Sequence, residues 1–590
     1  MLIRAVKYVY KADLATAIAR DIATIVTIAL DMYLINVAGQ FIDATIPLLS
    51  EWKSFDFTNY FYTESFQYLL IGLAGWIVTQ SLNNLRTYLY NKLWEKTRLN
   101  ANRQILTKIE SENLQEVEQK EFRELFTFVE NYSVQRLFDT YAQLSDTLKN
   151  GISMLSALLI LGESMGASVI LLALFGIAEP FVQYWGERKN KKYRLANVEG
   201  TKRSNYLWNV ASDVNAFSEL KVDGIIGYLK KKYHHSEESF SKGIIYLNKH
   251  YLIDNSFWAM VGQILQKGYV VYVLMVAIVK RFTIGHFQAL FNYANSGYNS
   301  SYQLWRSALK MLDNLSYAEK LFEFYDYEGF GDITNGDKLL AKGTPTLQFL
   351  KLDFQYPGEK NKILENLDFT IKPGERVAFV GGDGSGKSSL VKILCGLYEI
   401  VAGDYVIGDY SIRELRRGEL KRKIGVIFQD FVRYHMSIAQ NITLSAEKEN
   451  INHALLQQVM KVSLVDKFMD KEGLNLDQIL GKYFDGGREV SPGYWQRIAI
   501  ARMLYRNREI NIMDEPFTFI DGPSRAKILD NIFEFLGPDR TLIYITRDTD
   551  QLKKFDRVIY FKNGKIVESG GYKELVAKKG KFYKEIKFNK

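Results

Sequence analysis

Proline is scarce in the first part of the chain, and cysteine is almost absent from all of it. Of the nine prolines, only Pro47 and Pro180 precede Pro345. Because proline interrupts helix interiors, this scarcity predicts long helices in the first half. The single cysteine, Cys395, excludes an internal disulfide, and the six histidines show no spacing typical of a metal site.

Length and composition indicate two different parts. A chain of 590 residues is too long for one ordinary core. Its residues are 47% hydrophobic yet 24% charged, which favours a membrane part joined to a soluble part. The net charge of +9 comes in basic runs such as "ERKNKKYR", residues 187–194, which directly follow apolar segments. Such runs are typical of cytoplasmic flanks of membrane helices, so we expect no nucleic-acid partner.

Six stretches are long and apolar enough to cross a bilayer. They lie near residues 21–49, 67–93, 136–161, 165–187, 251–279 and 283–312. Ionisable residues interrupt them: Asp31, Asp146, Lys149, Glu179 and Lys267. Such groups either face a bundle interior or an aqueous cavity, or lie where helices project beyond the bilayer, and both readings stay open.

The connectors between these segments predict an orientation. Three are short, whereas residues 94–135 and 188–250 form long, basic, helix-patterned connectors. The positive-inside rule places these two connectors and the N-terminus in the cytoplasm. No cleavable signal peptide is evident, and Met1 to Arg20 is expected to form an amphipathic helix along the membrane surface. We therefore divide the chain into a transmembrane domain, 1–327, a linker, 328–346, and a second domain, 347–590.

A phosphate-binding loop follows the linker. Here short β runs alternate with helices, an α/β pattern. "ERVAFVGGDGSGKSSLVKILCGL" places G-x-x-x-x-G-K-S, residues 381–388, between a strand and a helix, the context that this loop requires. Glycines let backbone N–H groups and the helix end face a phosphate, while Lys387 supplies charge and Ser388 a hydroxyl for magnesium. The residues expected at the nucleotide are Gly381, Gly382, Asp383, Gly384, Ser385, Gly386, Lys387, Ser388 and Ser389.

Two carboxylates end a later apolar strand, "INIMDEP". Asp514 suits Mg²⁺, directly or through water, and Glu515 is positioned to polarise the attacking water. The alternative is an acidic strand end without chemistry. Together with the loop, the strand predicts ATP and Mg²⁺ as cofactors.

With these motifs the chain resembles the ABC transporter family, specifically an exporter-type half-transporter with six membrane helices fused to one ATP-binding domain. The resemblance implies that Tyr356 in "FQYPG" stacks on adenine and that Gln429 in "IGVIFQD" senses magnesium. It implies that Asp521 in "EPFTFID" is the D-loop aspartate. The long connectors correspond to the family's intracellular loops, which dock on ATP-binding domains.

The segment "VSPGYWQRIAIAR" departs from the family signature L-S-G-G-Q, which clamps the ATP held by the other subunit. Ser491 and Gly493 remain, but Pro492 lacks a backbone N–H and Tyr494 replaces an amide side chain. The lost hydrogen bond costs roughly 1.5–3 kcal/mol if nothing replaces it. Proline is tolerated in a first helical turn, and Ser491 can cap the helix, so we expect ATP binding by this segment to be weakened but not abolished.

A further departure is Arg547, which follows "RTLIYIT" at a position where the family has histidine. Arginine can hold phosphate charge, but it always stays protonated.

Three readings of function remain. The first is a homodimer that hydrolyses ATP slowly at two altered sites, and the second is a heterodimer with one altered, mainly structural site. The third is a regulatory or assembly subunit with little turnover, which the retained Lys387, Asp514 and Glu515 disfavour.

We expect a multi-pass protein of the cell membrane with a cytoplasmic ATP-binding domain. Its expected partners are a second half-transporter and lipid, and its expected cargo is a peptide, lipid or amphipathic compound. The cargo is not specified by the residues.

Overall fold

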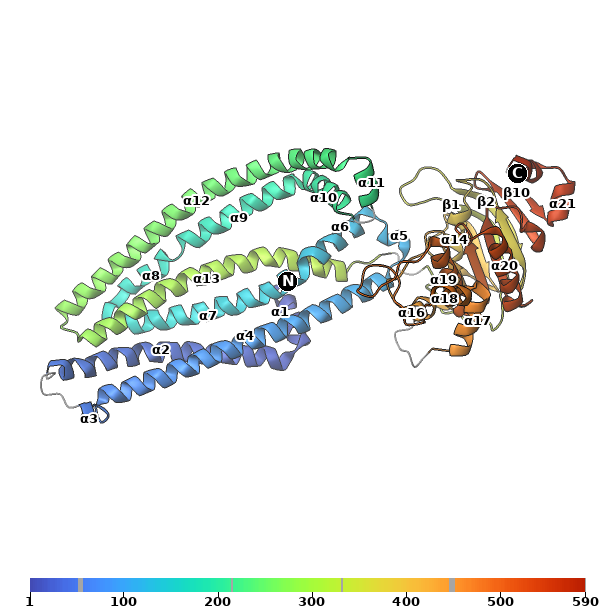
Figure 1. Ribbon diagram of the computed structural model, residues 1–590. Helices are drawn as coiled ribbons and strands as arrows, with labels where there is room; N and C mark the ends of the chain where they lie inside the picture. The colour runs from blue at the N-terminus through green and yellow to red at the C-terminus, as the bar shows by residue number, and fades with distance from the viewer. Residues whose placement is uncertain (51–56, 214–215, 330–332, 445–450, 589–590) are drawn as a thin grey trace. The chain divides into compact units, whose positions relative to one another are not determined.

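The computed structural model describes residues 1–50, 57–213, 216–329, 333–444 and 451–588. It divides into two compact units, a helical one and one with both sheets and helices (Figure 1). The helical unit comprises Met1–Leu106 and Glu124–Tyr327. The second unit comprises Glu328–Lys590 and a short insertion from the first half of the chain, Thr107–Arg123.

Long helices build the helical unit, as the scarcity of proline predicts. They are α1 (Leu2–Ala12), α2 (Leu14–Ser50), α3 (Phe57–Tyr60), α4 (Glu64–Ser111), α6 (Lys120–Phe128), the π-helical turn η2 (Val129–Ser133), α7 (Val134–Met165), η3 (Gly166–Val169), α8 (Ile170–Phe175), α9 (Ala178–Ala196), α10 (Val198–Ser212), α11 (Phe217–Val222), α12 (Ile226–Val279) and α13 (Ile284–Tyr325). The six apolar segments fall in α2, α4, α7, the run from η3 through α9, α12, and α13 with its N-cap Thr283. At 1.5 Å per residue, the 54 residues of α12 span roughly 80 Å, far more than the hydrocarbon core of a bilayer.

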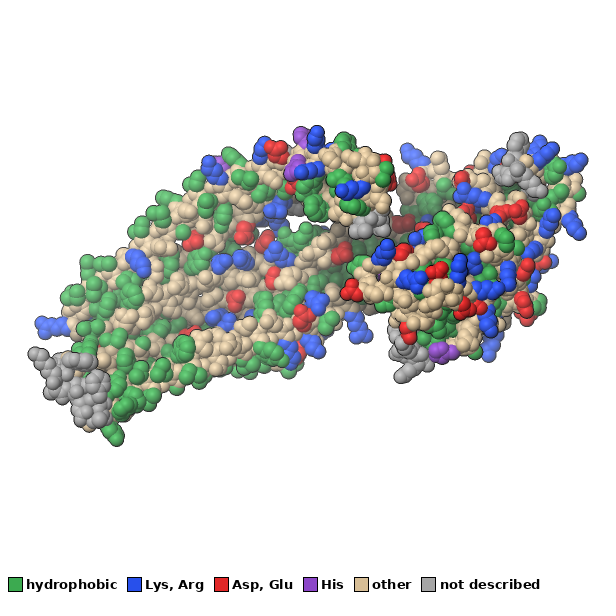
Figure 2. Space-filling view, in the orientation of Figure 1, with side chains coloured by type: hydrophobic (Ala, Val, Ile, Leu, Met, Phe, Trp, Pro, Cys, Tyr) green, Lys and Arg blue, Asp and Glu red, His purple; other side chains and the backbone are tan. Residues whose placement is uncertain are grey.

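Within the described residues, three helical stretches are long and apolar enough to cross a membrane. They are Leu14–Leu49, Lys120–Arg194, which contains two of the six segments, and Ile226–Val279. Exposed apolar side chains cover the part of this unit around α2, α8 and the adjoining portion of α12, while charged side chains concentrate towards the opposite end of its helices (Figure 2). Examples on α12 are Met275 and Ile278, each at least 60% exposed. A surface of this kind fits lipid better than water.

The N-terminal helix is shorter than the sequence suggests. α1 ends at Ala12, and α2 begins two residues later, at Leu14, rather than after Arg20. The break falls at Asp13, whose extended backbone (φ −160°) leaves the helix and whose carboxylate accepts a hydrogen bond from the backbone N–H of Thr16 at 3.1 Å. The acidic residue thus caps the next helix, a strong local stop signal. Ala5 and Val9 of α1 are fully buried.

Two sheets form the frame of the second unit. The antiparallel sheet has the order β2-β1-β4-β5, from β1 (Leu347–Phe354), β2 (Leu364–Ile371), β4 (Ala402–Ile407) and β5 (Tyr410–Ser411). The second sheet has the order β10-β9-β3-β8-β7-β6, from β3 (Arg376–Val380), β6 (Ile424–Ile427), β7 (Ile510–Asp514), β8 (Thr541–Thr546), β9 (Arg557–Lys562) and β10 (Lys565–Gly570). All its pairs are parallel except β9–β10. Parallel strands bring the residues that follow them to one edge.

Nine α-helices follow β3 along the described part of this unit. They are α14 (Lys387–Leu394), α15 (Glu419–Lys423), α16 (Ile438–Thr443), α17 (His453–Ser463), α18 (Val465–Glu472), α19 (Pro492–Tyr505), α20 (Gly522–Leu536), α21 (Tyr572–Ala577) and α22 (Lys581–Phe588). Some of them, such as α14, α15 and α19, pack on the second sheet. The central strands β7 and β8 are buried along their whole length, as expected for a sheet covered on both faces.

The insertion from the first connector packs into the second unit through α5 (Leu114–Val117). Leu114 packs against the hydrophobic core around β1 and β4. The backbone N–H of Glu399 donates to the side chain of Gln115 at 3.2 Å, and the Tyr398 hydroxyl donates to the carboxylate of Glu118. The tip of the first long connector is therefore part of the unit that carries the phosphate loop.

Candidate functional site

The phosphate loop lies between β3 and α14, as the motif requires. Gly384 (φ 70°) and Gly386 (φ 95°) adopt left-handed backbone conformations that favour glycine. A Cβ on Gly381 would lie 2.4 Å from the carbonyl oxygen of Phe561, so this position also excludes a side chain. The glycines let the loop turn directly from strand to helix, with the N-terminus of α14 behind it.

Lys387 lies at the start of α14 and points back into the loop. Its Nζ donates to the carbonyl oxygens of Gly381 at 2.7 Å and Gly382 at 2.9 Å, and to the hydroxyl of Ser385 at 2.9 Å. The side chain is buried, and burial, followed by the nearby charge of Arg547, lowers the pKa of Lys387. A buried ammonium ion held by neutral oxygens is well placed to exchange them for phosphate oxygens.

Asp514 ends β7 with a carboxylate that is 3% exposed. Burial raises the pKa of Asp514, and a hydrogen bond from Ser388 opposes that rise. Its Oδ1 has no hydrogen-bond partner among the described residues. A buried oxygen without a partner, beside a serine hydroxyl, fits the oxygen ligands that Mg²⁺ prefers.

Glu515 contacts the other two predicted catalytic residues, Gln429 and Arg547. Its Oε2 accepts from Gln429 Nε2 at 3.4 Å, and its Oε1 accepts from Arg547 Nε at 2.7 Å. Its backbone has φ 46°, an uncommon conformation outside glycine that clusters at functional sites. The side chain of Glu515 is 15% exposed, so a water molecule can reach it. The structure thus brings Glu515, Gln429 and Arg547 together.

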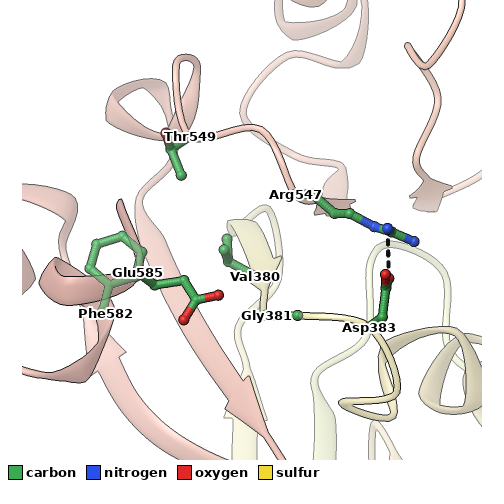
Figure 3. Close-up of a pocket in the computed structure, with 8 residues that line it drawn as sticks. Val380, Gly381, Asp383, Arg547, Thr549, Phe582 and Glu585 are labelled. Atoms are coloured by element: carbon green, nitrogen blue, oxygen red, sulfur yellow. Dashed lines mark ion pairs between the residues drawn. The ribbon is translucent and has the colours of Figure 1, made fainter. Parts of the chain in front are cut away.

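Arg547 also contacts the phosphate loop. Its Nη1 lies 2.6 Å from Asp383 Oδ1, and the pair borders an open pocket together with Glu585 and Thr549 (Figure 3). The hydrogen bond to Glu515, and then the nearby carboxylates, raise the pKa of Arg547. The motif gave Asp383 only as a loop position, and its pairing with Arg547 depends on residues far apart in sequence.

Tyr356 lies at the helix side of the loop. Its hydroxyl is 3.0 Å from the hydroxyl of Ser389, and its ring packs edge-on against Phe354 and Tyr398. The half-buried ring keeps part of its surface accessible. Its place beside the loop is compatible with stacking on a base, which stays a prediction.

The altered signature segment opens α19. Ser491 is the N-cap, and its hydroxyl accepts a hydrogen bond from the backbone N–H of Tyr494 at 3.3 Å. Pro492 occupies the first helical position, where proline needs no hydrogen-bond partner. The substitution is therefore accommodated by the local backbone.

Tyr494 points into the protein rather than towards solvent. It is 1% exposed, and its ring stacks on Phe468 of α18 with centroids 3.8 Å apart. Burial raises its pKa, and its hydroxyl has no hydrogen-bond partner within the described part of the chain. The ring acts as a core side chain, whereas the sequence motif indicated only that Tyr494 replaces an amide.

Gly493 and Gln496 tie α19 to the segment after Glu515. A Cβ on Gly493 would lie 2.6 Å from the carbonyl oxygen of Phe519. Gln496 is 2% exposed; its Nε2 donates to the carbonyl of Glu515 at 3.2 Å, and its Oε1 accepts from the N–H of Phe519 at 2.8 Å. Residue type and spacing alone assign no role to Gln496, because only the fold shows that it spans these two segments.

Asp521 is the N-cap of α20. Its Oδ2 accepts from the backbone N–H of Ser524 at 2.9 Å, a bond that lowers the pKa of Asp521. Its other oxygen, Oδ1, lies 3.6 Å from Arg497 on α19. A D-loop role for Asp521 stays a prediction; in the structure its side chain caps α20 and lies beside Arg497 of α19.

Comparisons with known proteins agree with this geometry. Residues 364–518 match the family described as ABC transporter, and this range contains the loop, Asp514 and Glu515. The chain is 27% identical to the subtilin transport ATP-binding protein SpaT of Bacillus subtilis, over 64% of this chain and 61% of SpaT. It is 24% identical to the nisin transport ATP-binding protein NisT of Lactococcus lactis subsp. lactis, over 87% of this chain and 85% of NisT.

The whole chain also has a structural counterpart. It aligns with a bacterial Atm1-family ABC exporter with ATP bound, at a TM-score of 0.77 and 18% identity, over 97% of this chain and 98% of that one. At this identity the likeness shows the fold. Residues 364–518 thus match the ABC transporter family, and the whole chain has the fold of an ABC exporter. It has the organisation of a half-transporter, a helical unit with candidate membrane helices fused to an α/β ATP-binding unit.

Proposed function

We propose that the chain is an ATP-driven exporter that works as a dimer of half-transporters in the cell membrane, with its ATP-binding unit in the cytoplasm. The single observation that carries the proposal is the convergence of Lys387, Asp514 and Glu515 on one loop of an ABC-type ATP-binding unit. A subunit that only bound ATP would not need a carboxylate held at hydrogen-bond distance by Gln429 and Arg547.

In this proposal each residue of the site has a distinct role in binding or hydrolysing ATP. The loop N–H groups and Lys387 bind the phosphates, and Tyr356 receives the base. Asp514 and Ser388 would hold Mg²⁺, which neutralises phosphate charge when bound. Glu515 accepts a proton from the attacking water, and Gln429 orients the carboxylate. Hydrolysis is the reaction that these groups perform together.

Transport would follow by alternating access. ATP binds a closed pair of ATP-binding units more tightly than an open pair, and this difference in affinity provides the free energy for closure. The long connectors would carry the closure to the membrane helices, and the packing of α5 within the ATP-binding unit supports that role. Hydrolysis then returns the pair to the open state.

The cargo proposal rests on the relatives. Their names mention subtilin, nisin, lipid A-core and a β-(1→2)glucan, so related chains serve chemically different molecules. We propose a peptide, lipid-linked or amphipathic compound. ATPase activity of the full chain in nanodiscs, measured with peptides and with lipids added separately, tests this: stimulation by one class identifies it, and stimulation by neither contradicts the proposal.

A heterodimer is the second candidate, because Pro492 and Arg547 depart from the family pattern. In that arrangement this chain supplies Glu515 to one site and the altered segment to a second, mainly structural site. The mass of the complex purified with and without co-expressed neighbouring proteins distinguishes the candidates. Two different chains at equal ratio would contradict the homodimer.

A further inference from the structure

Arg547 is shared between two carboxylates through different nitrogens. Nη1 lies 2.6 Å from Asp383 Oδ1 on the loop, and Nε lies 2.7 Å from Glu515 Oε1 after β7. The guanidinium group is planar and presents several donors in fixed directions. It can therefore release one partner while it keeps the other.

The two partners differ in how firmly they are held. The side chain of Glu515 is 15% exposed, whereas that of Asp383 is 75% exposed and that of Arg547 is 52% exposed. An exposed ion pair contributes little free energy. The contact between Asp383 and Arg547 is thus the one that a stronger anion can replace, while Glu515 keeps the guanidinium in place.

Asp383 is an unusual neighbour for a polyphosphate. It lies in the loop whose N–H groups and Lys387 attract negative charge, and its carboxylate repels a phosphate at close range. Figure 3 shows Asp383 directed from the loop towards Arg547, which enters from the end of β8. In the structure, Arg547 neutralises this carboxylate.

The position of Tyr356 indicates which phosphate would meet Arg547. Tyr356 contacts Ser389 at the helix side of the loop, whereas Arg547 contacts Asp383 near the strand side and Glu515 beyond it. A nucleotide with its base at Tyr356 extends towards Glu515, so its terminal phosphate approaches Arg547. This step rests on the proposed function.

We propose that Asp383 is a positioning residue that occupies Arg547 in competition with the terminal phosphate of ATP. When ATP binds, Nη1 exchanges the carboxylate of Asp383 for a phosphate oxygen, and Nε stays on Glu515. Asp383 thereby lowers the affinity for ATP through the ion pair that must break. ADP lacks the terminal phosphate and does not drive the exchange.

The exchange predicts that substitutions of Asp383 and Arg547 affect ATP affinity in a coupled way, with a definite sign. Asp383→Asn removes repulsion whether Arg547 is present or not, but it removes the ion pair only when Arg547 is present. It should therefore tighten ATP binding about two- to fivefold more in the unmodified chain than in the Arg547→Gln background, the size expected of an exposed pair. If the pair instead persisted in the bound state, the two effects would simply multiply.

The experiment is a double-mutant cycle on the full chain in nanodiscs. Equilibrium binding of MgATP and MgADP is measured for the unmodified chain, Asp383→Asn, Arg547→Gln and the double variant, with thermal unfolding as a check on folding. Asp409→Asn is the matched control, because Asp409 is an exposed aspartate in the β4–β5 turn. Paired with Arg547→Gln, it should show no coupling.

Coupling for ATP and none for ADP supports the exchange. Independent effects on ATP binding, or equal coupling for both nucleotides, would overturn it and leave the proposed function intact. A chain that binds neither nucleotide would overturn both.

Discussion

The loop of residues 381–388 and the segment of residues 490–494 belong to the same ATP-binding unit but differ in how they depart from the family pattern. The loop keeps its glycines, Lys387 and Ser388, and the strand end keeps Asp514 and Glu515. The segment has lost a backbone N–H at Pro492 and an amide side chain at Tyr494. The helix accommodates the first, and the core buries the second. Departures that a fold absorbs locally need not abolish a function.

Glu515→Gln should have the largest effect on the loop side of this comparison. Removal of a general base typically lowers a rate 10²- to 10⁴-fold. We expect ATP hydrolysis to fall by at least about 100-fold, while ATP binding persists and the closed dimer accumulates. Phosphate release and nucleotide retention measure both effects.

Glu534→Gln, an exposed glutamate of α20, is the matched control for this variant. Its rate should equal that of the unmodified chain. If Glu515→Gln released phosphate at an undiminished rate, Glu515 would not be the catalytic group.

Lys387→Ala should weaken nucleotide binding by about 10- to 100-fold, because hydrogen bonds from a charged group to phosphate are lost. Lys565→Ala removes a positive charge that pairs at the surface with Glu365 at 2.8 Å, and it should leave binding unchanged. Titration with MgATP distinguishes the two. Equal affinities for both variants would show that Lys387 does not hold the phosphates.

Tyr494→Gln restores the amide of the family signature, yet we expect it to destabilise the protein by about 2 kcal/mol. The variant loses the ring stacked on Phe468 and buries a polar group without a partner. Tyr494→Phe keeps the ring and removes only a hydroxyl that has no partner among the described residues. It should match or slightly exceed the stability of the unmodified chain. Thermal unfolding in detergent measures both, and the reverse order of stabilities would refute the core role of Tyr494.

Gly493→Ala should have the smallest effect, a loss of about 1–2 kcal/mol of stability with lower ATPase activity. The added Cβ would lie 2.6 Å from the carbonyl oxygen of Phe519, so α19 must shift. Gly522→Ala is a matched substitution at the start of α20, where nothing lies within 4 Å of the added atom. Unfolding curves for the two variants should differ, and coincident curves would contradict the packing argument.

Sequence patterns predicted the elements well and the long-range contacts poorly. The loop, the strand that ends in Asp514 and the cap at Ser491 are local, so residue type and spacing suffice to find them. The pairing of Asp383 with Arg547 joins residues that lie far apart in sequence. The inward direction of Tyr494 likewise depends on a residue of another helix, Phe468 of α18. These features follow from packing, which periodicity does not specify.

Hydrolysis by the unmodified full chain in nanodiscs tests the central claim most directly, namely that the loop is a working ATP site despite the altered segment. We predict slow phosphate release that requires a divalent cation and stops when Mg²⁺ is chelated, because the partnerless oxygen of Asp514 is suited to a cation. Release that continues unchanged after chelation, or a folded chain that binds ATP without hydrolysing it, would contradict this account.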